Sequence, residues 1–207
     1  PLPAPITGIG SLCTGQTSSL YDGVGGHWMS SNPAVASVGS TSGLLTAVGA
    51  GTTSITYTLP TGCRNHAIET VNPLPSLITG ASALCQGTTA TLTDDSTGGS
   101  WASSNTSVAA IGSGSGALTT MSPGTSTITY SLSTGCSVSR PVTVNPLPGT
   151  ITGGSSLCVG QTLPLTDWGG GTWTSSDVTV ATIGSSSGIV SGIIAGAVTI
   201  TYTLSTG

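Results

Sequence analysis

The cysteines are the residues whose spacing most clearly points to chemistry. The 207-residue sequence contains five of them. Cys13 and Cys63 lie 50 residues apart, and Cys85 and Cys136 lie 51 residues apart. Because nearly the same interval occurs twice, we predict one disulfide within each of two repeats, Cys13 with Cys63 and Cys85 with Cys136. Cys158 is then left unpaired in this sequence.

The sequence around the cysteines also predicts how the pattern would continue. Cys63 and Cys136 each follow a Thr-Gly pair, and the chain closes on Thr206-Gly207. We therefore expect a cysteine at the next position of the natural chain, as the partner of Cys158. Metal binding is the alternative for these cysteines, but no CxxC spacing is present and both histidines lie in the first 72 residues. Disulfides predict an oxidising, extracellular setting.

Other side chains that could do chemistry do not form a catalytic set. His27 and His66 have only serine or threonine at the corresponding places of the other repeats. Asp22, Asp94 and Asp167 recur before a glycine-rich stretch, which favours Asx-type turns over a calcium site with many carboxylates. No Gly-x-Ser-x-Gly nucleophile motif is present. We therefore expect no enzyme activity, no metal site and no cofactor.

Two aromatic side chains stand apart from the repeat pattern. Trp168 lies in an Asp-Trp-Gly-Gly segment where the other repeats have no tryptophan, and Tyr21 lies near the matching segment of the first repeat. An aromatic side chain in a turn can contact a sugar or a neighbouring module. We take Trp168 and Tyr21 as candidate contacts of this kind, whereas the recurring tryptophans are expected in the core.

The composition excludes several classes of partner. Charged residues make up 4% of the chain, there is no lysine, and the net charge is −4. A nucleic-acid-binding protein needs a basic surface, which this chain cannot form. No apolar run is long enough to cross a bilayer, so we expect no membrane insertion.

Several sequence features recur with one period and divide the chain into three modules. Pro-Leu-Pro begins at residues 1, 73 and 146, and a tryptophan that follows glycine-rich sequence recurs at 28, 101 and 173. The predicted modules are residues 1–72, 73–145 and 146–207, called modules 1, 2 and 3 below. Several features that keep one period indicate a tandem array. Asn-Pro-Leu-Pro at both junctions predicts a stiff, extended connector.

Within each module the pattern is that of β-strands. Thr53, Ile55, Tyr57 and Leu59 alternate with polar residues, as expected for a strand with one buried face. Clusters of glycine, serine and threonine recur every few residues, and no helical period is sustained. The sequence therefore predicts an all-β chain of three tandem immunoglobulin-like β-sandwich modules, the third lacking its last strand.

A longer stretch of each module resembles a known family. The sequence 28–38, WMSSNPAVASV, and 42–57, SGLLTAVGAGTTSITY, resemble the bacterial Ig-like domain, group two, of invasin- and intimin-type surface repeats. The paired cysteines and the Pro-Leu-Pro joints depart from that family. The resemblance implies a β-sandwich used as a spacer, stalk or fibre, with no common catalytic site.

These observations predict a structural segment of an extracellular bacterial fibre or surface stalk. The alternative is an array of adhesin modules that bind glycan or a host protein. We expect the last strand of each module at a sheet edge, because Pro141 falls inside it. We also expect self-association into a fibre or bundle, because no lysine guards the edge strands.

Overall fold

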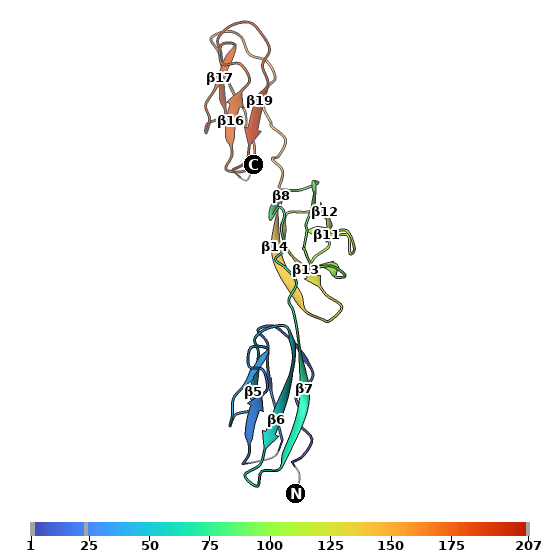
Figure 1. Ribbon diagram of the computed structural model, residues 1–207. Helices are drawn as coiled ribbons and strands as arrows, with labels where there is room; N and C mark the ends of the chain where they lie inside the picture. The colour runs from blue at the N-terminus through green and yellow to red at the C-terminus, as the bar shows by residue number, and fades with distance from the viewer. Residues whose placement is uncertain (1–2, 23–24, 206–207) are drawn as a thin grey trace.

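The chain folds into three β-sandwich modules that follow one another along a rod (Figure 1). The computed structural model describes residues 3–22 and 25–205. Over those residues the regular structure is β throughout, with 19 strands and no helix. The predicted fold class, all-β with tandem immunoglobulin-like modules, is confirmed.

Module 1 packs a four-stranded sheet, in the order β1-β7-β6-β3, against a three-stranded sheet, in the order β2-β5-β4. Its strands are β1 (Ser11–Cys13), β2 (Thr17–Ser19), β3 (His27–Ser30), β4 (Ala36–Val38), β5 (Leu44–Ala47), β6 (Gly51–Thr58) and β7 (Arg64–Asn72).

Module 2 repeats this topology, with sheets β10-β13-β14-β8 and β11-β12-β9. Its strands are β8 (Ala83–Cys85), β9 (Thr89–Thr91), β10 (Ser100–Ser103), β11 (Ala109–Ile111), β12 (Ala117–Thr120), β13 (Gly124–Ser131) and β14 (Ser137–Asn145).

Module 3 keeps the smaller sheet, β15-β18-β17, but its second sheet has two strands, β16-β19. Its strands are β15 (Thr162–Pro164), β16 (Thr172–Ser175), β17 (Ala181–Ile183), β18 (Ile189–Gly192) and β19 (Ile200–Thr203). Within the described residues it has no counterpart of β7 or β14, and a groove of about 830 Å³ lies along the half-buried Val198 and Ile200.

The core of each module is built around a tryptophan and a tyrosine on neighbouring strands. Alternation along β6 points Thr53, Ile55 and Tyr57 inward, as predicted. The ring centroids of Trp28 and Tyr57 lie 4.6 Å apart. The same pair recurs at 4.8 Å in module 2 and 4.6 Å in module 3. Tilted aromatic pairs at this spacing add to the stabilisation that burial alone gives.

A glycine is required where the tyrosine passes beneath the backbone. The amide of Gly26 donates to the hydroxyl oxygen of Tyr57 at 2.9 Å. A Cβ at Gly26 would lie 2.5 Å from the ring of Tyr57, so any larger residue there would push the tyrosine ring out of its position. Gly99 and Gly171 donate to Tyr130 and Tyr202 in the same way. This contact explains why a glycine always precedes the residue before the recurring tryptophan.

The prediction that the last strand lies at a sheet edge is wrong for the end of that strand. β7 pairs with β6 along its whole length, and its last three residues also pair in parallel with β1. β14 is likewise paired on both sides over its last three residues. Pro141 lies outside those three residues, in the part of β14 that does not pair with β8. Its missing backbone N–H therefore costs no hydrogen bond to β8. The prediction failed because the sequence pattern did not reveal the short first strand of each module, β1 or β8, which supplies the second pairing.

One buried acid distinguishes the core of module 1 from that of module 2. Glu69 on β7 is 0% exposed and stands where β14 has the fully buried Val142. The amide of Gly10 donates to its Oε2 at 3.1 Å, whereas Oε1 has no hydrogen-bond partner among the described residues. Burial raises the pKa of Glu69, and the Gly10 hydrogen bond opposes this only in part.

We expect Glu69→Val to stabilise module 1 at neutral pH by about 1–3 kcal/mol, since it replaces a poorly satisfied buried acid with the residue of module 2. Because folding raises the pKa of Glu69, the wild-type module is most stable below the unfolded pKa near 4.5 and loses stability as pH rises toward the folded value. Calorimetric unfolding at pH 4 and pH 7 measures both effects.

The matched control is Val142→Ile, which changes a core valine of module 2 without touching a titratable group. It should leave the pH dependence of module 1 unchanged. Part of the wild-type dependence should remain in Glu69→Val, because burial also raises the pKa of Asp22. An identical pH dependence in the wild type and in Glu69→Val would contradict the prediction.

Candidate functional site: the covalent joint between modules

Cys13 is held at the end of module 1 that faces module 2. It is the last residue of β1, which pairs in parallel with β7 so that Cys13 lies beside Asn72. A tight turn follows, in which the amide of Gln16 donates to the carbonyl of Cys13 at 2.9 Å and the Cys13 amide donates to Gln16 Oε1 at 2.9 Å. Gly15 adopts a φ of 87° within this turn, a conformation that favours glycine. These contacts fix the direction of the Cys13 side chain.

Cys136 lies at the opposite kind of module end, in the hairpin that joins β13 to β14. The amide of Leu132 donates to the Cys136 carbonyl at 2.9 Å, and the amide of Gly135 donates to the Leu132 carbonyl at 3.0 Å. Gly135 has a φ of 88°, which explains the glycine in the Thr-Gly-Cys sequence. Because β14 begins at Ser137, this hairpin points away from the end of module 2 that carries Asn145.

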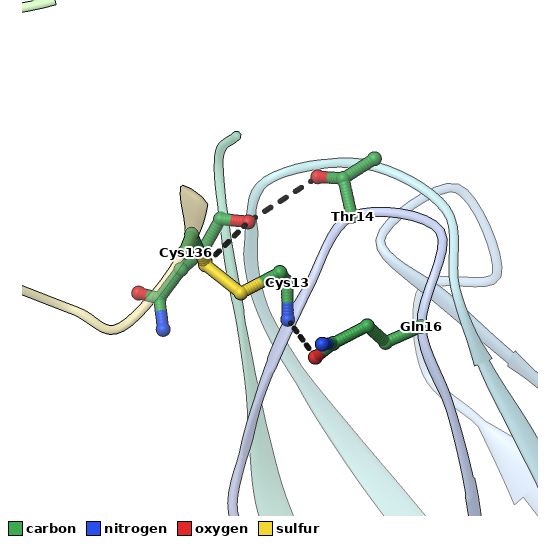
Figure 2. The surroundings of a disulfide bond; sticks show 5 residues. Cys13, Thr14, Gln16 and Cys136 are labelled. Atoms are coloured by element: carbon green, nitrogen blue, oxygen red, sulfur yellow. Dashed lines mark hydrogen bonds between the residues drawn. A yellow bond between two sulfur atoms is a disulfide. The ribbon is translucent and has the colours of Figure 1, made fainter. Parts of the chain in front are cut away.

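A disulfide joins Cys13 to Cys136 and therefore crosses the boundary between modules 1 and 2 (Figure 2). The Cα atoms of the two residues are 5.6 Å apart, within the usual range for a disulfide, and 123 positions separate them in the sequence. Cys136 is 1% exposed and Cys13 is 8% exposed, so the bond is shielded from reductants.

The predicted pairing within modules is wrong. Cys13 lies beside Asn72, at the end of β7, whereas Cys63 precedes Arg64, at its start. At about 3.3 Å per residue, the nine residues of β7 separate the two cysteines by roughly 30 Å. The same argument excludes Cys85 with Cys136, since Cys85 lies beside Asn145 at the far end of β14. In a repeat, intervals within a module and between modules are equally regular, so spacing could not decide.

The disulfide lies directly over the connector between the modules. The carbonyl of Asn72, the residue before Pro73, accepts hydrogen bonds from the Thr14 amide at 3.0 Å and the Thr14 hydroxyl at 3.3 Å. The Cys136 sulfur is 4.0 Å from the same carbonyl oxygen (Figure 2). Disulfide, hydrogen bonds and proline therefore all restrain one point of the chain.

The other cysteines share local backbone features with the two bonded ones. Cys63 lies in the β6–β7 hairpin, with the Leu59 amide donating to its carbonyl at 2.9 Å, and its thiol is free. Cys158 is exposed with a free thiol, and it begins a turn in which the Gln161 amide donates to its carbonyl at 3.0 Å. Cys85 ends β8, as Cys13 ends β1.

The candidate contact aromatics are exposed but far apart. Trp168 is 89% exposed and Tyr21 is 66% exposed. They belong to modules 3 and 1, which module 2 separates (Figure 1), so they do not form one site. The recurring tryptophans are all buried, as expected for core residues.

The recurring aspartates have different surroundings. The Asp94 carboxylate accepts the Ser96 amide at 2.8 Å, the predicted Asx turn, whereas Asp167 accepts the more distant Gly149 amide at 3.2 Å. Asp22 is nearly fully buried, and burial raises its pKa, offset in part by the Ala4 amide. In the described part of the chain, no three histidine, cysteine or acidic residues come together in a way that could hold a metal ion.

The residues that the structure describes include no helix long and apolar enough to cross a membrane. No family model and no curated protein matches the chain. Among solved structures, the chain is similar to the C-terminal fragment of intimin in complex with the intimin-binding domain of its translocated receptor. The identity is 16%, the TM-score is 0.48, and the match covers 76% of this chain and 68% of the fragment.

Two further solved structures are similar to the chain. One is domains 4 and 5 of the S-layer protein SbsC, at 17% identity and a TM-score of 0.32, covering 70% of this chain and 99% of that one. Another is Drosophila N-cadherin EC1-4, at 11% identity and a TM-score of 0.34, covering 89% and 63% of the two chains.

Proposed function

We propose that this chain is a stiff segment of an extracellular stalk or fibre and that it has no catalytic role. The observation that carries the proposal is the Cys13–Cys136 disulfide, which bonds one module to the next across their connector. A disulfide within a module would stabilise that module alone. One between modules restricts how they turn relative to each other, which is what a spacer requires.

The same bond supports an oxidising location. Disulfides of this kind form and persist outside the cytosol. The resemblance of residues 28–57 to group-two bacterial Ig-like repeats supports a place on a bacterial surface. Because charged residues make up only 4% of the chain, its shape would depend little on ionic strength.

Self-association along the sides of the rod is part of the proposal. β3 forms an edge of its sheet and presents the largely exposed Met29, with no lysine anywhere in the chain to oppose pairing. Such an edge favours lateral contacts between copies, and a bundle of rods would be stiffer than one rod.

Small-angle X-ray scattering of the oxidised chain tests the proposal. The Cys13→Ser/Cys136→Ser double variant removes the bond and leaves two hydroxyls of similar size. We expect the oxidised chain to scatter as one extended rod, and the double variant to show a shorter mean dimension and a broader distribution of distances, because its connector can bend. A concentration series of the same samples reports lateral association.

Cys63→Ser is the matched control, because the Cys63 thiol makes no disulfide in the structure. With the free thiols of all samples blocked by alkylation, it should scatter like the wild type. Equal distance distributions for the wild type and the double variant would refute stiffening by the disulfide.

An adhesin role is the second candidate, and the exposure of Trp168 is the observation that favours it. A fully accessible indole beside glycine-rich backbone can stack on a sugar ring or on an aromatic side chain of a host protein. Tyr21 offers a smaller surface of the same kind in module 1. Binding to a glycan array that Trp168→Ala abolishes would support this role.

A further inference from the structure

We infer that Cys63 and Cys158 are two complementary attachment sites, through which further modules of this kind bond to both ends of the segment by disulfides. The hairpin-type cysteine, Cys63, would bond to a module that precedes module 1. Cys158 begins the same kind of turn as Cys13, and we call both cysteines strand-type because Cys13 ends a strand. Cys158 would bond to a module that follows module 3. The inference extends the proposed spacer function, but it rests on cysteine geometry and not on stiffness.

The first support is that Cys63 has the backbone geometry of Cys136. In both hairpins, the amide four residues upstream of the cysteine donates to the cysteine carbonyl at 2.9 Å. The glycine before each cysteine has a similar positive φ, 82° at Gly62 and 88° at Gly135. Cys136 uses this geometry to bond to the module before it. The structure therefore places the Cys63 thiol where a bond to a preceding module forms.

The second support is that Cys158 has the turn of Cys13. The amide three residues downstream donates to the cysteine carbonyl at 2.9 Å for Cys13 and 3.0 Å for Cys158. The glycine of each turn, Gly15 or Gly160, donates to the end of the facing strand at 2.9 Å. Cys13 uses this turn to bond to the module after it. The exposed Cys158 is thus set to bond to a following module.

The two sites are complementary because a hairpin-type cysteine, Cys136, meets a strand-type cysteine, Cys13, at the joint between modules 1 and 2. Two cysteines of the same type lie at the same end of their modules, so a bond between them would require two modules to meet end to end in opposite directions. If each strand-type cysteine bonds to the hairpin-type cysteine of the following module, all modules point in the same direction. Each module is then bonded head to tail to the next.

The chemistry is thiol–disulfide exchange with a disulfide oxidant, such as oxidised glutathione or a protein dithiol oxidase. The Cys158 thiolate attacks one sulfur of the oxidant, forms a mixed disulfide and releases one thiol. A Cys63-type thiolate then attacks the Cys158 sulfur, forms the new disulfide and releases the second thiol. Two protein thiols are oxidised, and one oxidant disulfide is reduced.

Two single-site chains test the inference, each also carrying Cys85→Ser so that Cys85 takes no part in the exchange. The Cys63→Ser chain offers Cys158, and the Cys158→Ser chain offers Cys63. The folded chains are mixed in a buffer of oxidised and reduced glutathione, and the disulfide-linked peptides are then identified by mass spectrometry.

We expect the Cys63–Cys158 peptide to exceed either symmetric peptide by about tenfold, the factor that roughly 1.4 kcal/mol of favourable contacts at the joint would give. The same mixture in concentrated urea should yield the statistical distribution. The Cys13–Cys136 peptide in the same digest shows that the chains are folded. Symmetric and mixed peptides in statistical proportion from folded chains, or no linked chains at all, would overturn the inference.

The linked peptides, taken together with the scattering data, distinguish a failure of this inference from a failure of the proposed function. Head-to-tail bonding with flexible rods in scattering would leave the attachment sites intact and refute the stiff spacer. Stiff rods without head-to-tail bonding would do the reverse. If the main disulfide-linked peptide joined Cys13 to Cys63, the Cys13–Cys136 disulfide from which the inference starts would be wrong.

Discussion

Pulling one oxidised molecule from its two ends should release roughly 400 Å less chain than pulling a Cys136→Ser molecule. The disulfide carries the load directly from residue 13 to residue 136, so the chain between them is never stretched. The hidden length follows from 123 intervals at about 3.3–3.6 Å each. Module 1 from β2 to β7 would bear no force and should stay folded. Single-molecule force spectroscopy with peptide-tag handles at the two termini measures this difference.

Cys63→Ser is again the control, because it removes a cysteine that carries no load. Its force–extension curve should match that of the oxidised wild type, and a reducing agent should convert the wild-type curve into that of Cys136→Ser. Equal released lengths for the wild type and Cys136→Ser would show that the bond between modules does not carry the load.

Trp101→Ala should destabilise module 2 by about 3–5 kcal/mol, the usual cost of removing a large buried aromatic side chain. Trp101 is 8% exposed and packs on Tyr130, so its removal leaves a cavity and takes away an aromatic pair. That cost is a large share of the stability of a small domain. Urea unfolding, monitored by circular dichroism, should show module 2 melting well before the others.

Trp168→Ala is the matched control, since it deletes the same side chain from a position that is 89% exposed. It should change the free energy of unfolding by no more than about 0.5 kcal/mol. A loss of stability as large as that of Trp101→Ala would contradict the assignment of Trp168 to the surface.

Local pattern was sufficient to predict the fold of each module but not the bonds between modules. The alternation through Ile55 and Tyr57 and the recurrence of the tryptophan depend on neighbouring residues, so the β-sandwich was accessible from sequence. The disulfide depends on which end of β7 meets the three residues of β1. A strand of three residues is too short to show a recognisable alternation of apolar and polar residues. The parallel register that places Cys13 beside Asn72 could therefore not be predicted from the sequence.

The buried Glu69 is a second case in which the sequence could show a position but not the contact made there. Glu69 and Val142 occupy matching positions, and a charged residue at a core position is a departure that the repeat alignment could have shown. What the sequence could not show is that Gly10 supplies its hydrogen bond, because that contact joins residues 59 positions apart.

The bond between modules also bears on what a protease could do to such a molecule. A single cut anywhere between residues 13 and 136 would leave the two halves of the chain covalently joined through the disulfide. The peptide backbone and the disulfide are two parallel covalent routes over the same span, and severing either one leaves the other. For a protein exposed to digestion outside the cell, continuity at that joint would not depend on an intact backbone.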